Sequence, residues 1–172
     1  MKQANNIFLI GPMGTGKSTI GRLLAKLLGL KFDDTDYEIR RRTGVDIPTV
    51  FDFEGEEGFR KREKTVLKEL TQNNGLVLAT GGGVVLDPDN RNILSTRGVV
   101  VYLHCSPEQQ FRRTERDRNR PLLQTADPLA RLRELMVERD PLYRQTADIV
   151  VSTEKRNASS VAREIKRRIE SV

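Results

Sequence analysis

The stretch GPMGTGKST, Gly11 to Thr19, directly follows the apolar run IFLI at residues 7–10. It matches the pattern G-x-x-x-x-G-K-[ST] at every required position, with a predicted strand before it and a predicted helix after it. The glycines allow successive backbone N–H groups to turn toward a phosphate, and the start of the helix adds its positive end. Lys17 can reach the β- and γ-phosphates, and Ser18 can offer a hydroxyl to Mg²⁺. The stretch therefore predicts a nucleoside triphosphate site rather than a simple glycine-rich turn.

The segments around this stretch predict an α/β fold. Short apolar runs with strand character, the second of them weaker, stand at residues 7–10, 30–32, 76–79, 99–103 and 149–151. Helical patterns lie between these runs, and Ser106 and Asn157 are suited to cap two of the helices. Short strands that alternate with helices indicate one α/β domain, in which helices cover both faces of a parallel sheet.

Composition excludes several classes of protein. The 172 residues are 37% hydrophobic and 31% charged, with a net charge of +6, which suits one compact domain. No apolar run approaches the roughly 20 residues of a membrane-spanning helix. Cys105 is the only cysteine and His104 the only histidine, which excludes an internal disulfide and a His-based triad and fits a reducing cytoplasm. We therefore expect a cytoplasmic protein without a membrane partner.

The excess of basic residues has two readings. Nucleic acid is one partner of basic proteins, but aromatic residues make up only 5% of this chain and do not alternate with basic ones as a base-stacking surface requires. A small anionic substrate explains a local excess of arginine equally well. We expect no nucleic-acid partner.

The predicted phosphate site does not by itself identify the phosphate acceptor. A GTP-driven switch would need a guanine-reading N-K-x-D sequence after a later strand, and the chain contains none. A motor or a helicase would normally be far larger. A kinase that acts on a small molecule remains, so the acceptor site must be sought elsewhere in the chain.

The first candidate acceptor residues are the aspartates of the sequence DDTD at residues 33–36. They follow a predicted strand, and the carboxyl ends of parallel strands line the ligand crevice of an α/β sheet. Asp34 and Asp36 alternate in what we predict to be an extended segment, and so share a face. One can serve Mg²⁺, while the other can orient the acceptor hydroxyl and take its proton. The alternative is that these aspartates only cap the following helix.

Two further segments supply arginine and glycine. In GEEGFRKRE, Gly55–Glu63, Arg60 and Glu63 are three residues apart and can pair on one face of a predicted helix. Taken alone, this would be a surface ion pair of little energetic consequence. In Thr80–Gly83, three glycines follow a predicted strand and leave backbone free to touch a ligand closely. A flexible turn is the alternative there.

Basic residues gather again later in the chain. Residues 112–120 carry five arginines against two acids, and the loop at residues 119–128 follows them. Such a basic loop beside a triphosphate indicates a lid that excludes water and brings an arginine to the transferring group. Arg139 stands before Pro141, where we predict a helix break. A solvated helix face is the alternative for any one of these arginines.

Together these residues resemble the shikimate kinase family, whose members are P-loop kinases of the nucleoside monophosphate kinase fold. The resemblance covers about residues 7–168. The cradle sequence is shared by many families, whereas the ordered set of five later motifs is specific. These motifs are DTD at Asp34–Asp36, G-E-x-x-F-R-x-x-E at Gly55–Glu63, TGGG at Thr80–Gly83, RPL at Arg120–Leu122 and R-x-P-L-Y at Arg139–Tyr143.

The resemblance implies a three-layer αβα fold with a five-stranded parallel sheet in the order 2-3-1-4-5. It implies transfer of the γ-phosphate of ATP to the 3-hydroxyl of shikimate, with Mg²⁺ held by Ser18 directly and by Asp34 through water. The catalytic residues would be Lys17, Asp36 and Arg120. The residues implied to contact ATP are Gly14, Thr15, Gly16, Lys17, Ser18, Thr19, Arg113, Arg120 and Arg156. Those implied to contact shikimate are Asp36, Phe51, Phe59, Arg60, Gly81, Gly82, Gly83 and Arg139.

The resemblance also implies a shikimate-binding segment at about residues 34–62, a lid at about residues 112–124 and a monomer. Arg60 and Arg139 would hold the carboxylate of shikimate, a role that suits the two-pronged guanidinium group. The residues alone do not select shikimate, because a nucleoside monophosphate kinase or a gluconate-type kinase would use much the same chemistry. A non-catalytic nucleotide-binding module is the alternative from another class, against which Lys17, Ser18, Asp36 and Arg120 argue.

Overall fold

The computed structural model describes residues 5–115 and 120–171, and within these ranges parallel strands form one five-stranded sheet. The strands are β1 (Asn6–Ile10), β2 (Lys31–Asp34), β3 (Leu76–Ala79), β4 (Val99–His104) and β5 (Ile149–Ser152). Their order in the sheet is β2-β3-β1-β4-β5, and every neighbouring pair is parallel. The predicted sheet and its strand order are therefore confirmed.

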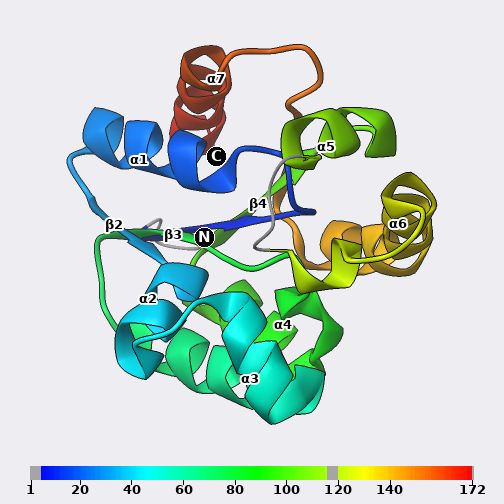
Figure 1. The fold of residues 1–172 in the computed structure, drawn as a ribbon. Coiled ribbons are helices and arrows are strands. Elements are labelled where there is room, and N and C mark those ends of the chain that lie inside the picture. Colours follow the sequence, from blue (N-terminus) through cyan, green and yellow to red (C-terminus); the bar gives the residue numbers. More distant parts are fainter. Residues whose placement is uncertain (1–4, 116–119, 172) are drawn as a thin grey trace.

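Helices cover both faces of this sheet. They are α1 (Lys17–Leu28), α2 (Thr35–Thr43), α3 (Ile47–Leu70), α4 (Pro88–Arg97), α5 (Pro107–Thr114), α6 (Pro128–Thr146) and α7 (Ala158–Glu170), with short 3₁₀ turns at η1 (Val84–Leu86) and η2 (Pro121–Leu123). In Figure 1, α1 and α7 lie together on one side of the sheet, and α3 and α4 lie on the other. None of the helices in the described ranges combines the length and the apolar character that crossing a membrane requires.

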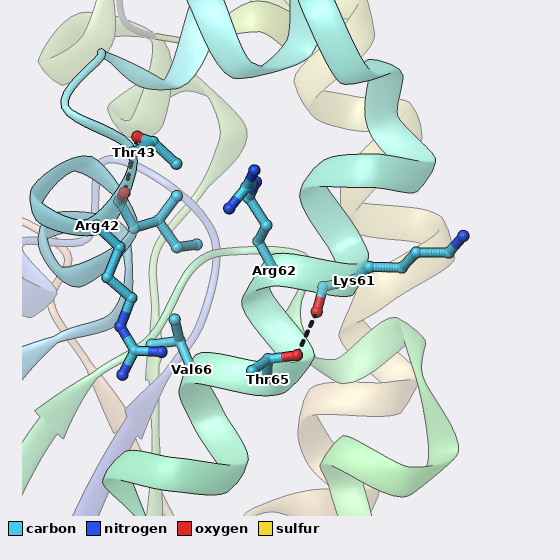
Figure 2. A pocket seen from close by; sticks show the side chains of 7 residues that line it. Arg42, Thr43, Lys61, Arg62, Thr65 and Val66 are labelled. Carbon is cyan, nitrogen blue, oxygen red and sulfur yellow. Dashed lines mark hydrogen bonds between the residues drawn. The ribbon is translucent and has the colours of Figure 1, made fainter.

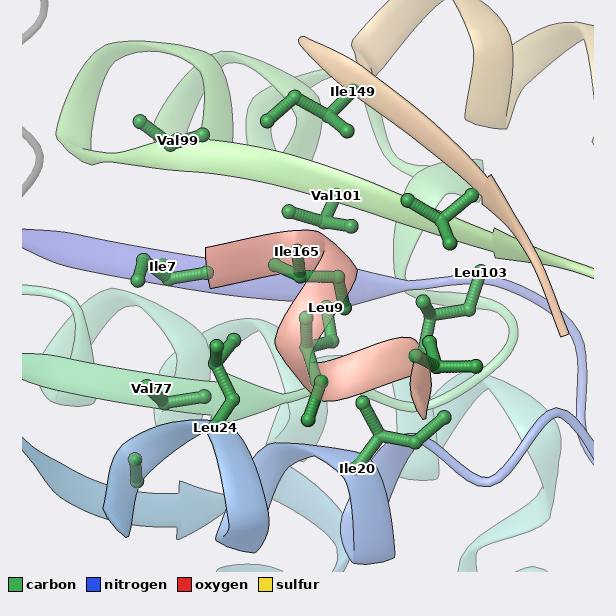
Figure 3. Packing of buried hydrophobic residues seen from close by; sticks show 14 residues of the cluster. Ile7, Leu9, Ile20, Leu24, Val77, Val99, Val101, Leu103, Ile149 and Ile165 are labelled. Atoms are coloured by element: carbon green, nitrogen blue, oxygen red, sulfur yellow. The ribbon is translucent and has the colours of Figure 1, made fainter. Parts of the chain in front are cut away.

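The central strand β1 shows why the sheet needs two covering layers. Side chains alternate between the faces of a strand, yet every residue of β1 is buried. Ile7 and Leu9 belong to an apolar cluster that also takes in α1 and α7, and Figure 3 shows their side chains beside Leu24 and Ile165. Phe8 and Ile10 belong to a second cluster on the opposite face. A strand that is apolar at successive positions is thus a strand with both faces covered.

Helix caps fix where several elements begin. The Ser106 hydroxyl accepts a hydrogen bond from the Gln109 N–H at the start of α5, and the Asn157 side chain accepts one from the Ser160 N–H at the start of α7. Both caps confirm the predicted helix starts. Gly29 ends α1 in the left-handed conformation that glycine adopts without steric cost.

Two local predictions are wrong. Asp36 does not lie in an extended segment, because β2 ends at Asp34 and α2 begins at Thr35. Asp34 caps that helix through its side chain, so Asp36 stands in the first helical turn. The predicted break at Pro141 is also absent, because α6 continues through this residue to Thr146. Packing of the α6 face on the sheet outweighs the loss of one backbone hydrogen bond at the proline.

The segment that follows α2 has an internal bend. Gly55 has φ 71° and ψ 178°, which no helix contains, so α3 consists of two helical pieces joined at this glycine. The predicted restart of a helix at Gly55–Glu63 agrees with this geometry. The bend separates the piece that carries Phe51 from the piece that carries Phe59, and the two rings meet across it with centroids 4.9 Å apart. The backbone freedom of Gly55 therefore allows the Phe51 and Phe59 rings to come into contact.

Candidate active site

The glycine-rich loop lies at the carboxyl end of β1, between β3 and β4. Gly11 has φ 140°, and a Cβ there would stand 2.4 Å from the Leu103 carbonyl oxygen, so the loop passes directly against β4. Gly16 has φ 85° and caps α1 without a side chain. Gly11 is therefore needed both for space and for its positive φ, whereas Gly16 is needed for its positive φ alone.

Lys17 spans the opening of this loop. Its Nζ donates hydrogen bonds to the carbonyl oxygens of Gly11 at 2.7 Å and Pro12 at 2.8 Å. Part of the side chain is exposed, but its amine is desolvated, and this burial lowers the pKa of Lys17 to about 7, with the charge of Arg120 acting in the same direction. An anion that entered the loop would favour the charged form of the amine.

Thr15 stabilises the glycine-rich loop from inside the protein. Its side chain is fully buried, and its hydroxyl donates to the Pro12 carbonyl oxygen at 3.0 Å. Since that hydroxyl is already used inside the loop, Thr15 can meet a ligand only through its backbone. Thr15 would thus contact a ligand through its backbone, whereas Lys17 and Ser18 can contact one through their side chains.

Ser18 and Asp34 come together at the mouth of the loop. The Ser18 hydroxyl donates to Asp34 Oδ2 at 2.5 Å. The other carboxylate oxygen of Asp34 accepts from the N–H groups of Asp36 and Tyr37, which fixes its direction. Asp34 therefore caps the helix, but it does not only cap it, because its other oxygen accepts the hydrogen bond from Ser18.

Two connected hollows run along the carboxyl ends of the strands. The larger, which we call the cradle cleft, has a volume of about 390 Å³ and is lined by the glycine-rich loop, Lys17, Ser18, Asp34 and Arg113. The smaller, which we call the inner pocket, has a volume of about 60 Å³ and is lined by Phe51, Phe59, Arg60, Glu63, Gly83 and Arg139. The residues that line both are Met13, Asp36, Ile47, Gly81, Gly82 and Arg120.

Asp36 stands where the two hollows meet. Burial raises the pKa of its carboxyl group, and the neighbouring Asp34 adds to this effect. Among the described residues, none donates a hydrogen bond to its buried Oδ1 atom. A buried carboxylate oxygen without a donor is costly, so it is available for a hydroxyl group brought by a ligand.

The inner pocket holds further buried polar atoms of the same kind. In the described parts of the chain, Glu63 Oε2 and the Nε atoms of Arg60 and Arg139 also have no hydrogen-bond partner. Arg139 is only 4% exposed, although it carries a charge. Buried groups of this kind are normally satisfied, and several unsatisfied ones around one pocket indicate a polar, anionic ligand.

The prediction of a surface ion pair between Arg60 and Glu63 is wrong in one respect. The pair exists, with Arg60 Nη1 donating to Glu63 Oε1 at 3.0 Å, but Glu63 is only 1% exposed. Burial raises the pKa of Glu63 to about 7, although the charge of Arg60 opposes this shift. The spacing in the sequence identified the pair, whereas its burial depends on the glycine turn that packs against it.

The glycine turn after β3 is needed for space rather than for conformation. A Cβ on Gly81 would stand 2.8 Å from Glu63 Oε2, and a Cβ on Gly83 would stand 2.4 Å from both Nη atoms of Arg60. A Cβ on Gly82 would find only ordinary contacts, of which the nearest, at 3.6 Å, are Arg139 Nη1 and the Met13 nitrogen. Gly81 and Gly83 thus leave room for the charged side chains of Glu63 and Arg60, both from α3, to approach the backbone.

The predicted nucleotide arginines have different positions. Arg113 lines the cradle cleft and donates to the Gly14 carbonyl oxygen at 3.0 Å. Arg120 lines both hollows. Arg156 lies beside α7, where it donates to the Ser152 carbonyl oxygen and pairs with Glu164. The part of the predicted lid at residues 116–119 lies outside the described residues.

A separate hollow of about 200 Å³ lies between α2 and α3, as Figure 2 shows. Arg42 and Arg62 flank it, but Arg42 pairs with Glu69 at 2.6 Å and Arg62 pairs with Glu54 at 2.6 Å. The Lys61 side chain points away from the hollow in this view. Because its cations already have acidic partners, this hollow lacks the unsatisfied polar groups of the inner pocket.

Comparison with known proteins identifies the family. The family model described as shikimate kinase matches residues 13–170, which is most of the chain. The chain belongs to the shikimate kinase family. It is 60% identical over 167 residues to shikimate kinase from Thioalkalivibrio sulfidiphilus, an alignment that covers 97% of this chain and 88% of that protein.

Solved structures of the family have the same fold. Shikimate kinase from Acinetobacter baumannii, in complex with shikimate, matches with a TM-score of 0.96 and 51% identity, covering 99% of this chain and 95% of that one. Shikimate kinase from Aquifex aeolicus matches with a TM-score of 0.84 and 37% identity, covering 96% of each chain. The predicted family and the predicted P-loop kinase fold are confirmed.

Sequence reasoning missed several residues that line the hollows of this kinase. Met13 and Ile47 line both of them and have no chemical signal in the sequence, whereas Thr80 and Pro121 each line one and stand in the motifs TGGG and RPL. Tyr143 lines neither hollow, but it closes the motif R-x-P-L-Y and lies fully buried beside Arg139. Its place in that motif was the only available signal.

Proposed function

We propose that this protein transfers the γ-phosphate of ATP to the 3-hydroxyl of shikimate, giving shikimate 3-phosphate and ADP in the synthesis of chorismate and the aromatic amino acids. Membership of the shikimate kinase family supports this function. The observation that carries it is the continuity of the cradle cleft with the inner pocket, with Asp36 at the junction. A phosphate donor and a hydroxyl acceptor could meet there.

The cradle cleft suits the triphosphate of ATP. Backbone N–H groups of the glycine-rich loop, the amino end of α1 and the Lys17 amine all offer positive charge at one place. Phosphoryl transfer depends mainly on positioning and on stabilising charge as it moves to the leaving oxygen. We assign this role to Lys17, with Arg120 approaching from the junction of the two hollows.

The residues around Ser18 fit a magnesium ion. Mg²⁺ prefers hard oxygen ligands and usually takes only one or two from the protein, the others coming from phosphates and water. The Ser18 hydroxyl and Asp34 Oδ2 form such a pair at the mouth of the loop. We propose that Ser18 binds the ion directly and Asp34 through water. When bound, the ion would supply positive charge that stabilises the negative charge of the phosphates during transfer.

The inner pocket suits a carboxylate that carries hydroxyl groups. Arg60 and Arg139 present two guanidinium groups, and the glycine turn allows a ring to lie against the backbone. We propose that both arginines hold the shikimate carboxylate and that Asp36 takes the proton of the attacking hydroxyl. A carboxyl group with a raised pKa is a stronger base than an ordinary aspartate.

The proposal also assigns roles to longer segments of the chain and to residues around the two hollows. We propose that residues 34–62 form the shikimate-binding segment, that residues 112–124 form a lid, and that Phe51 and Phe59 wall the inner pocket. Arg113 and Arg156 are proposed to flank the adenine. The single domain, the monomeric state, the cytoplasmic location and the absence of a nucleic-acid partner stay predictions from the sequence.

A coupled ADP-release assay with ATP and Mg²⁺ tests the acceptor. Shikimate would be compared with AMP, CMP and gluconate at equal concentrations. Turnover with shikimate alone is the expected result. Turnover with a nucleotide or gluconate instead would retain the kinase chemistry and contradict the proposed acceptor.

Replacing Arg139 by lysine should weaken the use of shikimate. Lysine keeps the charge but loses the paired N–H groups, so we expect the KM for shikimate to rise about tenfold or more while the KM for ATP is unchanged. Steady-state kinetics with each substrate varied in turn measures both values. Arg133→Lys is the control, because Arg133 lies on the same helix but pairs with Glu108 at the surface. A rise in the KM for ATP alone would move Arg139 to the nucleotide side.

Replacing Gly83 by alanine should displace Arg60. The new methyl group would stand 2.4 Å from both Nη atoms, and the end of a flexible side chain yields more easily than backbone. We expect little change in the melting temperature and a rise in the KM for shikimate of about tenfold, the usual scale for a lost charged hydrogen bond. The double variant with Arg60→Ala checks the cause. If the two effects add fully, Gly83 does not act through Arg60.

A further inference from the structure

A buried tyrosine ties α6 to the glycine turn. The Tyr143 hydroxyl donates a hydrogen bond of 2.5 Å to the Gly82 carbonyl oxygen, which is 61 positions away in the sequence. The side chain is fully buried, and its ring packs on Tyr102 with centroids 4.8 Å apart. The contact is therefore a fixed internal link between two elements that line the inner pocket.

The same hydroxyl also interacts with Arg139. Arg139 lies one helical turn before Tyr143, on the same face of α6. Burial raises the pKa of the Tyr143 hydroxyl, and the nearby positive charge of Arg139 opposes this shift. A tyrosine hydroxyl that donates one hydrogen bond can also accept one, so Tyr143 keeps an acceptor lone pair close to Arg139 while it donates to Gly82.

The link to Gly82 extends to the second arginine. A peptide unit is planar, so fixing the Gly82 carbonyl fixes the orientation of the whole Gly82–Gly83 peptide. Gly83 lies directly against the guanidinium of Arg60, too close to admit a Cβ. The position of this peptide therefore sets how far Arg60 can approach the inner pocket. The Tyr143 hydroxyl is thus close to Arg139 and is connected with Arg60 through the Gly82–Gly83 peptide.

We propose that Tyr143 is a positioning residue that sets the spacing of Arg60 and Arg139 for the carboxylate of the acceptor. This inference rests on the proposed function, in which the two arginines hold that carboxylate. Tyr143 lines neither hollow in the described structure, so it acts through the arginines rather than on the ligand. Without its hydroxyl, the Gly82 carbonyl loses its donor and Arg139 loses a polar neighbour, so the positions of both arginines are less well fixed.

Tyr143→Phe tests the proposal, because phenylalanine keeps the ring and removes only the hydroxyl. We expect the KM for shikimate to rise about tenfold, which corresponds to the loss of roughly one buried hydrogen bond. The KM for ATP should stay within about twofold. Calorimetric titration of shikimate, without ATP turnover, should show the same fall in affinity. Replacing Tyr143 by 4-aminophenylalanine, which restores an N–H donor toward Gly82, should recover part of the affinity.

Tyr102→Phe is the matched control. Tyr102 is also fully buried and packs on Tyr143, but its hydroxyl donates to Asp140 at 2.6 Å and does not reach the glycine turn. A merely structural role predicts that both variants lose stability and change kinetics alike. A specific role predicts that only Tyr143→Phe raises the KM for shikimate. Equal kinetics in the two variants would overturn the proposal.

A second variant and a wild-type control allow the experiment to give an answer in every case. If Tyr143→Phe does not fold, 3-fluorotyrosine at position 143 keeps the ring and the hydroxyl while changing its strength as a donor, and an unchanged affinity for shikimate would then count against the proposal. Wild-type protein is run in the same assay. No turnover with shikimate by the wild type would contradict the proposed function itself, whereas normal turnover with an unaffected Tyr143→Phe would contradict only the role of Tyr143.

Discussion

Lys17→Met is expected to fold like the wild type and to lose about a thousandfold or more of kcat, because it removes a positive charge that acts on the transferring phosphate. Methionine has a similar length and is uncharged, so the shape of the loop should be largely kept. The coupled ADP-release assay measures the loss, and circular dichroism checks the fold. Lys26→Met is the control, since Lys26 is exposed on the same helix. A variant with wild-type kcat would contradict the role of Lys17.

The same variant has a second readout in proton uptake. In the free protein burial lowers the pKa of Lys17 to about 7, so at pH 8 most of these amines are neutral. Bound phosphates favour the charged form and raise that pKa, so ATP binding should take up most of one proton at pH 8 and little at pH 6. Titration calorimetry in buffers of different ionisation enthalpy measures this uptake. Lys17→Met should abolish it, and uptake that persists in the variant would assign the proton to another group.

Asp36→Asn should be nearly inactive. Asparagine has the same shape but is a far weaker base and carries no charge, so kcat should fall about a hundredfold to ten-thousandfold, the range for loss of a general base. Asp33→Asn is the control. Asp33 is three residues away in the sequence but does not line either hollow in the described structure. Substantial turnover by Asp36→Asn would leave another group to take the proton.

The same substitution should also stabilise the fold. Burial raises the pKa of Asp36 above its ordinary value of 3.8, so the charged carboxylate is disfavoured in the folded state. The folded protein therefore binds more protons than the unfolded chain, and this group reduces stability as pH rises from its ordinary pKa to its raised folded pKa, above which the loss stays constant. We expect Asp36→Asn to raise the melting temperature at pH 8 and to change it little near pH 4. A lower melting temperature at pH 8 would show that the charge of Asp36 is stabilised in place.

These opposite effects follow from a site built for a ligand. Asp36, Glu63, Arg60 and Arg139 are buried with atoms that lack hydrogen-bond partners among the described residues. Burying such groups costs stability, and a ligand that satisfies them recovers part of that cost. Activity and stability should therefore respond in opposite directions when one of the buried acids becomes an amide.

The sequence by itself determined the phosphate cradle and the architecture around it. The cradle needs particular residues at fixed, adjacent positions, so Gly11 to Ser18 can be identified without knowledge of any distant contact. Short apolar runs and capped helices are likewise local patterns, which is why all five predicted strand segments overlap observed strands and the caps at Ser106 and Asn157 agree with the structure. The ordered motifs added the family.

Tertiary structure decided which of these residues are buried and what they face. The spacing of Arg60 and Glu63 predicted their pairing, but only the glycine turn packed over α3 removes Glu63 from water and raises its pKa. Asp36 faces the junction of the two hollows because Asp34 caps a helix that begins at Thr35, inside the segment that the sequence predicted to be extended. The bond between Tyr143 and Gly82 joins residues 61 positions apart. Burial and long-range contact depend on how elements pack, which no local pattern of residues contains.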